Sequence, residues 1–345
     1  MNQPTGHLDK NLDTKAETLK KLYGHMKEAK VLPQFTFTIG DWQSRKEALV
    51  LEFRELIWNA RVIVRSSALN EDTKTQSQAG KYVSIANVSG IEAFQAAVEQ
   101  VITSYEDSDP GNQVLVQPML EHVAICGVAF TLDPNTGGNY YVINYDKTGS
   151  TSAVTSGNGK NDFLYYQFKG INTETDIENG NSKNGLQEMQ RVTAALEELE
   201  NFFGQENLDV EFAITEEGEL YIFQVRALCL QTEPVDKEEQ RQELQRIEQK
   251  IRGNQMPKPF LCGQKAIYGV MTDWNPAEMI GIRPKPLAMS LYQEVITDSV
   301  WAYQRDNYGY RNLRSFPLMV DFGGLPYIDI RVSFNSFVPA GLDEE

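Results

Sequence analysis

Residues 208–228, LDVEFAITEEGELYIFQVRAL, decide the fold because they read as two alternating strands joined by a turn at Glu217-Gly218. Apolar side chains take every second place in both halves, as expected of strands with one face in a core. The alternation assigns these apolar places to Val210, Phe212 and Ile214 in the first half and to Tyr221, Phe223 and Val225 in the second.

The intervening places carry polar groups, and Glu211, Gln224 and Arg226 are predicted to share one face of this hairpin. A carboxylate and an amide oxygen suit Mg²⁺, and a guanidinium suits a phosphate. The face therefore fits a Mg²⁺–triphosphate. A surface hairpin whose outer face carries a Glu–Arg pair explains the same residues equally well.

Bulk composition indicates a globular protein of two or three domains, since the 345 residues are 41% hydrophobic and 23% charged. The net charge of -16 disfavours nucleic acid and anionic membranes as partners. No secretory signal or membrane-spanning run is visible, so we expect a cytoplasmic protein. Cys126, Cys229 and Cys262 are widely spaced in apolar runs, which predicts buried free thiols rather than a zinc site.

The pattern along the chain mixes helices and strands, which predicts an α+β protein. Helices are expected over 13–30, 43–58, 91–105, 186–203 and 235–253, and strands over 35–39, 61–68, 114–120, 126–132 and 139–146. Two polar stretches, 148–162 and 172–185, read as loops. Further on, NPAE (275–278) is a helix start, a long helix covers 290–306, and 324–337 reads as a strand with Asp329 and Arg331 on one face.

An ATP-driven phosphotransferase needs cations along the phosphates, metal ligands, an adenine slot and a mobile phosphate cover. Candidates for each part occur in chain order. They are Lys15, Arg65, Gln117 with Met119, the loop 148–162, and finally Glu211, Gln224 and Arg226.

Three stretches resemble the ATP-grasp half of phosphoenolpyruvate synthase and pyruvate phosphate dikinase. VRSSALNEDTKTQSQAGKYVSIANV is similar to VRSSATAED…SFAGQ…LNV, and VLVQPMLEHVAICGVAFTLDPNTGG is similar to VQxM…GVxFTxDPxTG. LDVEFAI…GELYIFQVRAL is similar to DIEWAI…GELYxLQxRP. The three occur in the right order over about residues 10–230. The resemblance implies an ATP-grasp fold of two α+β lobes with mixed or antiparallel sheets.

By position, the resemblance assigns Lys15 and Arg65 to the triphosphate, and Gln117 and Met119 to the adenine hinge. Glu211 and Gln224 match its metal-binding pair, and Arg226 matches its γ-phosphate arginine. ATP and Mg²⁺ are therefore the implied cofactors, with Lys15, Arg65 and Arg226 as the catalytic residues.

The chain also departs from the family pattern. DTKA replaces GGKG around Lys15, and Leu132 stands where some members have arginine. The glycine-rich GLGE…VVSG segment reads TGSTSAVTSG, so its Glu is missing and Thr151 or Ser152 stands near that place.

In that family, a histidine on a swivelling domain receives the phosphoryl group and carries it to a separate acceptor. The only histidines here, His7, His25 and His122, lie in nothing like that domain's Gly-Gly…His segment. We therefore expect a truncated chain or one component of a split system, with the swivelling domain as a partner absent from this chain.

Four segments are expected: an N-terminal ATP-grasp lobe (1–90), a C-terminal lobe (91–235), a helical linker (236–257) and a partial α/β acceptor-binding domain (258–345). The last segment is similar to the middle domain of L-glutamine kinases, and rifampin phosphotransferase shares the three-part plan. L-Glutamine is therefore the candidate small-molecule acceptor. Candidate acceptor-site residues are Arg283, Lys285, Asp329 and Arg331, which a helix-start turn and an edge strand explain almost as well.

Structural alternatives remain for single residues. Arg65 could pair with Glu71 or Asp72, Lys15 could be a solvated helix lysine, and Asp209 reads as a structural partner rather than a metal ligand. For the whole chain, the alternatives to a kinase fragment are phosphoenolpyruvate synthesis proper and a non-catalytic nucleotide-binding module.

Overall fold

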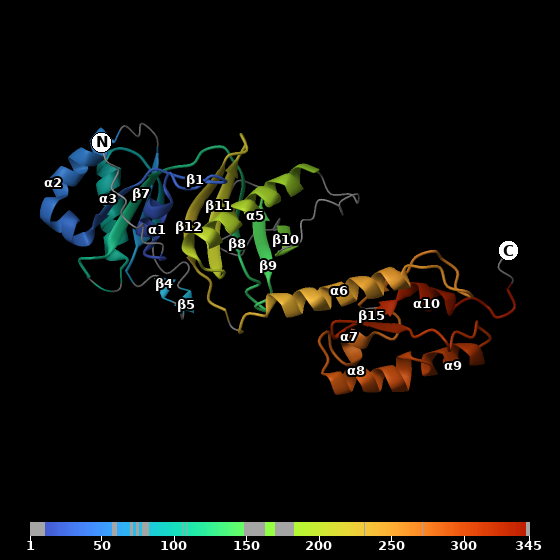
Figure 1. Cartoon of the computed structure of the whole chain (residues 1–345). Helices are drawn as coiled ribbons and strands as arrows, with labels where there is room; N and C mark the ends of the chain where they lie inside the picture. Colours follow the sequence, from blue (N-terminus) through green and yellow to red (C-terminus); the bar gives the residue numbers. More distant parts are fainter. Residues whose placement is uncertain are drawn as a thin grey trace. The chain divides into compact units, whose positions relative to one another are not determined.

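The computed structural model describes residues 11–56, 61–69, 72–73, 76–77, 83–105, 107, 109–147, 163–169, 183–230, 232–270 and 272–342. The chain forms two compact units, residues 1–236 and 237–345. Figure 1 shows the first unit built around β-sheets and the second built mainly of helices. Each unit is described by itself.

The first lobe of unit 1 is a four-stranded antiparallel sheet in the order β2-β7-β3-β6. Two helices cover its outer face, where Phe37, Val64 and Val116 pack against Trp42 and Phe94. Its elements are β2 (Phe35–Thr38), α2 (Ile39–Glu55), β3 (Val62–Ser67), β6 (Ser84–Val88), α3 (Ile91–Thr103) and β7 (Gln113–Pro118), and the short strands β4 (Asp72–Thr73) and β5 (Gln76–Ser77) pair with each other.

The second lobe is a six-stranded sheet in the order β1-β12-β11-β8-β9-β10, in which only the β1–β12 pairing is parallel. Helices α1 and α5 pack on one face of it, and α5 is seen lying over the strands in Figure 1. Its elements are α1 (Lys15–Leu22), β1 (Lys30–Val31), β8 (Val123–Phe130), β9 (Tyr140–Asp146), β10 (Phe163–Phe168), α5 (Lys183–Phe203), β11 (Leu208–Thr215) and β12 (Leu220–Ala227).

Sheet membership sets the boundary between the lobes. The sequence analysis places it at residue 90, but α3 and β7 belong to the first lobe's sheet and core, so that lobe extends to Pro118. Helix α1, in contrast, packs into the core of the second lobe through Leu19 and Leu22. From α1 onward, the chain therefore passes from the second lobe to the first and returns.

A β-bulge changes the predicted faces of the β11–β12 hairpin. Glu211 pairs with Gln224 but Phe212 pairs with Ile222, so Phe223 is the extra residue. Beyond the bulge the alternation is reversed, and Ile222 joins Val225 in the core. The assignment of Tyr221 and Phe223 to the apolar face is therefore wrong, because one inserted residue exchanges the two faces of a strand.

Local end signals account for two helix boundaries that the sequence analysis misplaced. Helix α1 ends at Leu22 instead of residue 30, and Gly24 follows with a left-handed φ of +75°, which favours glycine. Helix α2 begins at Ile39 instead of residue 43, because the side chains of Thr38 and Asp41 form a reciprocal capping box. These hydrogen bonds from Thr38 hold the pKa of Asp41 below its usual value.

Unit 2 combines α6 (Lys237–Asn254), α7 (Pro276–Met279), α8 (Pro286–Tyr292), the π-helix η1 (Gln293–Thr297), α9 (Val300–Asn307) and α10 (Ile330–Asn335) with an antiparallel sheet in the order β13-β15-β14. The strands are β13 (Tyr268–Gly269), β14 (Met319–Phe322) and β15 (Leu325–Asp329). Their core is built around Trp301, Leu318 and Ile328, all of them fully buried.

Asn275 caps α7 through Glu278, as the NPAE pattern predicts. The strand expected over 324–337 is wrong beyond Asp329, whose carboxylate accepts the Val332 N–H at 3.2 Å and starts α10 instead. The long helix over 290–306 is divided into α8, η1 and α9.

None of the three cysteines, all within the described residues, forms a disulfide, but only Cys126 is buried, and burial raises the pKa of its thiol to about 11. Cys229 is half-buried and Cys262 is exposed, so the expectation of three buried thiols is wrong for Cys262. Within the described residues, no helix combines the length and the apolar character needed to cross a membrane.

Gly127 of β8 provides a test of how closely β8, β9 and β11 approach. A Cβ at this position would lie 2.3 Å from the Asn144 carbonyl oxygen and 2.9 Å from the Phe212 ring. We expect Gly127→Ala to lower the free energy of unfolding by about 3 kcal/mol or more, because backbone as well as side chains must move. Urea unfolding measures it.

The control is Ala129→Gly, two residues along the same strand, which we expect to cost about 1 kcal/mol. A stability of Gly127→Ala within 0.5 kcal/mol of the parent would show that the described packing is wrong.

Candidate nucleotide-binding site

Two cross-strand pairs form a polar platform on the face of β11 and β12 opposite α5. Asp209 lies directly across from Arg226, and Glu211 lies directly across from Gln224. The shared face therefore agrees with the one that the alternation predicts. Gln224 is buried, and Glu211 keeps 20% of its side chain exposed. Amide and carboxylate oxygens are thus held next to each other on rigid strands.

Asp209 fixes the guanidinium of Arg226. Its carboxylate oxygen Oδ2 accepts from Nε at 2.8 Å and lies 2.7 Å from Nη2. Burial raises the pKa of Asp209, and the charge of Arg226 opposes that rise. A buried carboxylate needs such a partner, so Arg226 is both oriented and stabilised by the pair.

A second basic residue reaches this platform from the other lobe. Arg65 of β3 places Nη2 3.6 Å from the Glu211 carboxylate, and the two side chains are 16% and 20% exposed. The structural alternatives for Arg65, pairs with Glu71 or Asp72, involve side chains outside the described part of the chain. The observed pair brings the predicted phosphate arginine to the predicted metal ligand.

Lys15 stands at the first position of α1 and is buried. The Thr14 side chain caps the helix, and the next backbone N–H, that of Ala16, donates to Ser67 Oγ at 3.0 Å. Since Ser67 ends β3, two residues after Arg65, this contact anchors the start of α1 at the end of the Arg65 strand. A helix N-terminus and a lysine then add positive charge at this end of the strand.

The inner face of the first lobe's sheet carries several polar side chains, whereas the outer face is mainly apolar. Arg65 pairs with Leu115 and Ile63 with Gln117, so Arg65 and Gln117 lie diagonally on one face. Thr36 pairs with Leu115 and joins this face from β2. Leu115 itself packs in the core of the second lobe, which shows that this face is directed toward that lobe.

Several polar atoms in this region are buried and, among the described residues, make no hydrogen bond. They are Arg65 Nε, both amide atoms of Gln117, Gln34 Oε1 and Thr36 Oγ1. Each such atom costs roughly 1–3 kcal/mol unless a partner is supplied. Thr36, Arg65 and Gln117 share one face of the sheet, and a concentration of such atoms on one face is typical of a site that a polar ligand completes.

The hinge residues differ in what they can offer. Gln117 is 1% exposed and its amide is unsatisfied, whereas the backbone N–H of Met119 donates to the Arg61 carbonyl at 2.8 Å. A ligand at this edge would therefore meet the Gln117 side chain rather than a free Met119 N–H.

The remaining residues of unit 1 that the sequence analysis singled out lie outside the described residues, in the interior or on the surface. The loop 148–162, with Thr151 and Ser152, lies outside the described residues. Leu132, where some family members have arginine, is buried. His25 and His122 are exposed surface residues, and His7 is outside the described range.

The donor set fits Mg²⁺ held jointly with a nucleotide. Glu211 provides a carboxylate and Gln224 an amide oxygen, and no group of three or more His, Cys, Asp or Glu side chains occurs in the described part of the chain. Mg²⁺ commonly uses one or two protein ligands and takes the rest from phosphates and water. An all-protein metal site is not indicated there.

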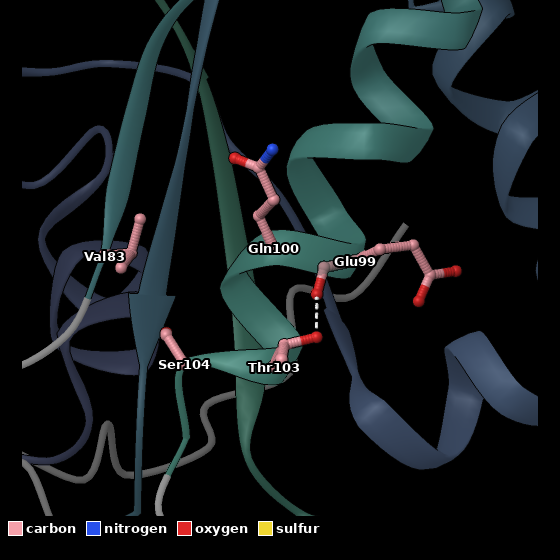
Figure 2. Close-up of a pocket in the computed structure, with 5 residues that line it drawn as sticks. All are labelled: Val83, Glu99, Gln100, Thr103 and Ser104. Carbon is pink, nitrogen blue, oxygen red and sulfur yellow. Dashed lines mark hydrogen bonds between the residues drawn. The ribbon is translucent and has the colours of Figure 1, made fainter.

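The hollow shown in Figure 2 is unrelated to these residues. It has a volume of about 460 Å³ and lies beside α3, lined by Val83, Glu99, Gln100, Thr103 and Ser104. The Glu99 carboxylate is engaged by Lys46 at 2.8 Å and by the Trp42 indole at 2.9 Å. These contacts hold the pKa of Glu99 below its usual value, which is typical of a structural contact.

Comparison with protein families shows a match over residues 43–170 to the family "Pyruvate phosphate dikinase, AMP/ATP-binding domain". The matched segment contains Arg65, Gln117 and Met119. It does not include Lys15, Glu211, Gln224 or Arg226. The match supports nucleotide binding, and together with the two α+β lobes it confirms the ATP-grasp fold class.

Solved structures that are similar to the chain include two D-alanine–D-alanine ligases. The ligase from Helicobacter pylori is 14% identical over 62% of this chain and 51% of its own, with a TM-score of 0.35. The ligase from Coxiella burnetii is 11% identical over 62% of this chain and 47% of its own, with a TM-score of 0.37. PH1788 from Pyrococcus horikoshii is 16% identical over 62% of this chain and 88% of its own, with a TM-score of 0.37. The chain spans about half the length of each ligase, and these scores indicate partial likeness only. No curated protein sequence matches it.

Sequence reasoning missed Gln34, whose Nε2 donates to the Ala16 carbonyl at 2.8 Å while Oε1 lacks a partner. It also missed Thr36, although the alternation of the FTFT strand could have placed that side chain on the inner face. No motif marks either residue.

We expect Gln117→Met to leave the free energy of unfolding unchanged or to raise it by about 1 kcal/mol, because the substitution removes two unsatisfied polar atoms at similar volume. Urea unfolding without nucleotide measures it.

The matched control is Gln113→Met on the same strand. Gln113 accepts from Thr14 Oγ1 at 2.7 Å and donates to Glu17 at 3.2 Å, so its loss should cost about 1 kcal/mol. Equal destabilisation by both substitutions would contradict the description of Gln117.

Proposed function

We propose that the chain is the ATP- and Mg²⁺-binding part of an ATP-dependent phosphotransferase. The observation that carries this proposal is the meeting of Arg65 with Glu211 beside five unsatisfied polar atoms. One ligand that brings phosphates, a metal ion and a base with donors and acceptors would use all of them. The match to an AMP/ATP-binding domain supports the same assignment.

In this proposal each residue of the site has one role. Lys15 and Arg65 bind the phosphates, and Arg226, held by Asp209, stabilises charge on the γ-phosphate during transfer. Gln117 binds the adenine end, near Met119. Glu211 and Gln224 hold Mg²⁺, which would neutralise phosphate charge. When ATP and Mg²⁺ are bound, Arg65 exchanges its contact with Glu211 for a contact with a phosphate.

The receiving group is proposed to be a histidine of a separate swivelling domain, which then passes the phosphoryl group to a small-molecule acceptor. L-Glutamine is the candidate acceptor, because the sequence of residues 258–345 resembles the middle domain of L-glutamine kinases. Phosphoenolpyruvate synthesis is the alternative within the same reaction class, and direct assay of both acceptors distinguishes them.

A non-catalytic nucleotide-binding module is the alternative from another class. The missing Glu of the glycine-rich segment favours it. The Asp209–Arg226 pair opposes it, because binding alone needs no arginine held by two contacts to a buried carboxylate.

Glu211→Gln tests the metal role. We expect calorimetry to show that Mg²⁺ tightens ATP binding to the parent chain by about tenfold or more, equal to ~1.4 kcal/mol, and that the variant loses this gain. Glu216→Gln, at the exposed turn of the same hairpin, is the control and should behave like the parent. Absence of ATP binding to the parent with Mg²⁺ would refute the proposed function itself.

Arg226→Lys separates binding from transfer. The lysine keeps a charge beside Asp209 but cannot reproduce the two contacts, so we expect less than a threefold change in ATP affinity and roughly a hundredfold slower transfer. Transfer is followed with [β-³²P]ATP and [γ-³²P]ATP and a separately expressed carrier domain. Equal losses in affinity and rate would refute the role of Arg226, and an unlabelled carrier with the parent chain would favour the non-catalytic module.

A further inference from the structure

Unit 2 contains a second arrangement of charged and polar side chains, in which an arginine and an aspartate meet from different elements. Arg305 of α9 donates through Nη2 to both carboxylate oxygens of Asp273, at 3.1 and 3.3 Å. Ser333 of α10 donates to the same carboxylate at 3.2 Å. We name Asp273, Arg305 and Ser333, with the ring of Phe337, the Asp273 cluster.

Phe337 supports the guanidinium from one side. The carbon Cζ of Arg305 lies 4.3 Å from the centre of the Phe337 ring, which fits a cation–π contact. Phe337 is 48% exposed, and the side chains of Arg305 and Asp273 are 18% and 23% exposed. The ion pair is therefore partly shielded but can still be reached from solvent.

The residues on either side of this ion pair carry polar atoms that are buried and, within the described part of the unit, make no hydrogen bond. Thr272 Oγ1 and Trp274 Nε1 flank Asp273 along the chain, and Gln304 Oε1 precedes Arg305. Arg305 Nε is also unsatisfied. Two donors, one acceptor and one hydroxyl thus come from the two segments that the ion pair joins.

The backbone around Asp273 is constrained as well. Trp274 has a φ of +59°, which is strained for a bulky side chain, and the Tyr292 hydroxyl donates to its carbonyl. Burial, and next the Asp273 charge, raise the pKa of Tyr292. Strain held in place by a neighbouring contact is a feature of binding sites, and here it accompanies the unsatisfied atoms.

A second ion pair in the same unit, between Asp329 and Arg331 at 4.0 Å, differs because both side chains are only 3% exposed. Asp329 caps α10, and Arg331 donates to the carbonyls of Met256 and Asn254 at 3.2 and 3.0 Å. These two candidates from the sequence analysis therefore hold the fold together, while Arg283 and Lys285 are exposed. Arg331 Nε is also unsatisfied, but its ion pair is closed to solvent. Within the described part of unit 2, the Asp273 cluster combines an ion pair that solvent reaches with unsatisfied donors and acceptors on both of its segments.

We propose that the Asp273 cluster binds a small zwitterion of the α-amino acid class with a polar side chain. The ligand's carboxylate would pair with Arg305, and its ammonium group would pair with Asp273. Each side chain of the ion pair would thus exchange its present partner for an oppositely charged group of the ligand. Trp274 Nε1 and Gln304 Oε1 supply a donor and an acceptor for the ligand's side chain. That this cluster is the acceptor site of the phosphotransferase rests on the proposed function. Binding of the zwitterion itself does not need nucleotide.

Calorimetry on the full chain without nucleotide tests the proposal. The probes are L-glutamine, glutaramic acid, which lacks the ammonium group, and 4-aminobutanamide, which lacks the carboxylate. We expect L-glutamine to bind and each single-charge analogue to bind at least tenfold more weakly. L-Alanine keeps both charges but has no polar side-chain group, so its affinity should lie between that of L-glutamine and those of the two single-charge analogues.

Arg305→Lys and Asp273→Asn should each weaken L-glutamine binding at least tenfold. The matched control is Arg314→Lys, because Arg314 also pairs with an aspartate, Asp306 at 3.5 Å, and lies over the ring of Tyr303. This control should leave binding unchanged. Ser333→Ala provides a milder change if Asp273→Asn fails to fold, and we expect a three- to tenfold loss.

Absence of L-glutamine binding, or affinities unchanged in folded Arg305→Lys and Ser333→Ala, would overturn the proposal. So would analogues that bind as well as the amino acid. Because no nucleotide is present, these results are independent of whether unit 1 binds ATP.

Discussion

The contact between Arg65 and Glu211 is the interaction on which the proposed site depends. It joins a strand of the first lobe to a strand of the second, and it brings the proposed phosphate-binding arginine to the proposed metal-binding carboxylate. The two groups are only partly exposed, so their attraction is less screened than that of a surface pair. In the proposed function, a Mg²⁺–nucleotide would offer each group a stronger partner, so the same two residues would hold the lobes together without ligand and bind the ligand when it is present.

Other elements of unit 1 place further candidate residues around the Arg65–Glu211 contact. Strand β7 carries Gln117 next to Arg65, and α1 brings Lys15 to the end of β3 through the contact of Ala16 with Ser67. On the opposite lobe, Asp209 holds Arg226 in place. The unsatisfied atoms of Gln34, Thr36, Arg65 and Gln117 are expected of a face that a polar ligand completes, as the proposed function requires. Binding sites commonly depart from the rule that buried polar groups are paired.

Much of the site could be predicted from the sequence because its residues lie in strands, whose period of two fixes the faces. Glu211, Gln224 and Arg226 share a face as predicted, since their strands pair without interruption from Asp209 to Glu211. Beyond Glu211 the bulge at Phe223 reversed the faces, and a pattern of hydrophobicity does not reveal such an insertion. The boundary between the lobes was also missed, because membership of a sheet depends on long-range pairing of β7 with β2 and β3.

Contacts made by single side chains were the least predictable. Arg65 was weighed against partners on its own loop, while the observed partner is 146 positions away in the sequence. The Asp273 cluster joins residues from three separate segments, and no spacing in the sequence marks it. Asp329 and Arg331 were expected on one face of a strand, whereas Asp329 starts a helix and Arg331 donates to carbonyls of another segment.

The central claim is that facing strands of both lobes form one nucleotide site, and hydrogen–deuterium exchange tests it most directly. On addition of ATP and Mg²⁺, we expect slower amide exchange in β3 and β7 of the first lobe and in β11 and β12 of the second, with AMP alone protecting mainly β7. Exchange that does not change, or protection confined to one lobe, would contradict the account.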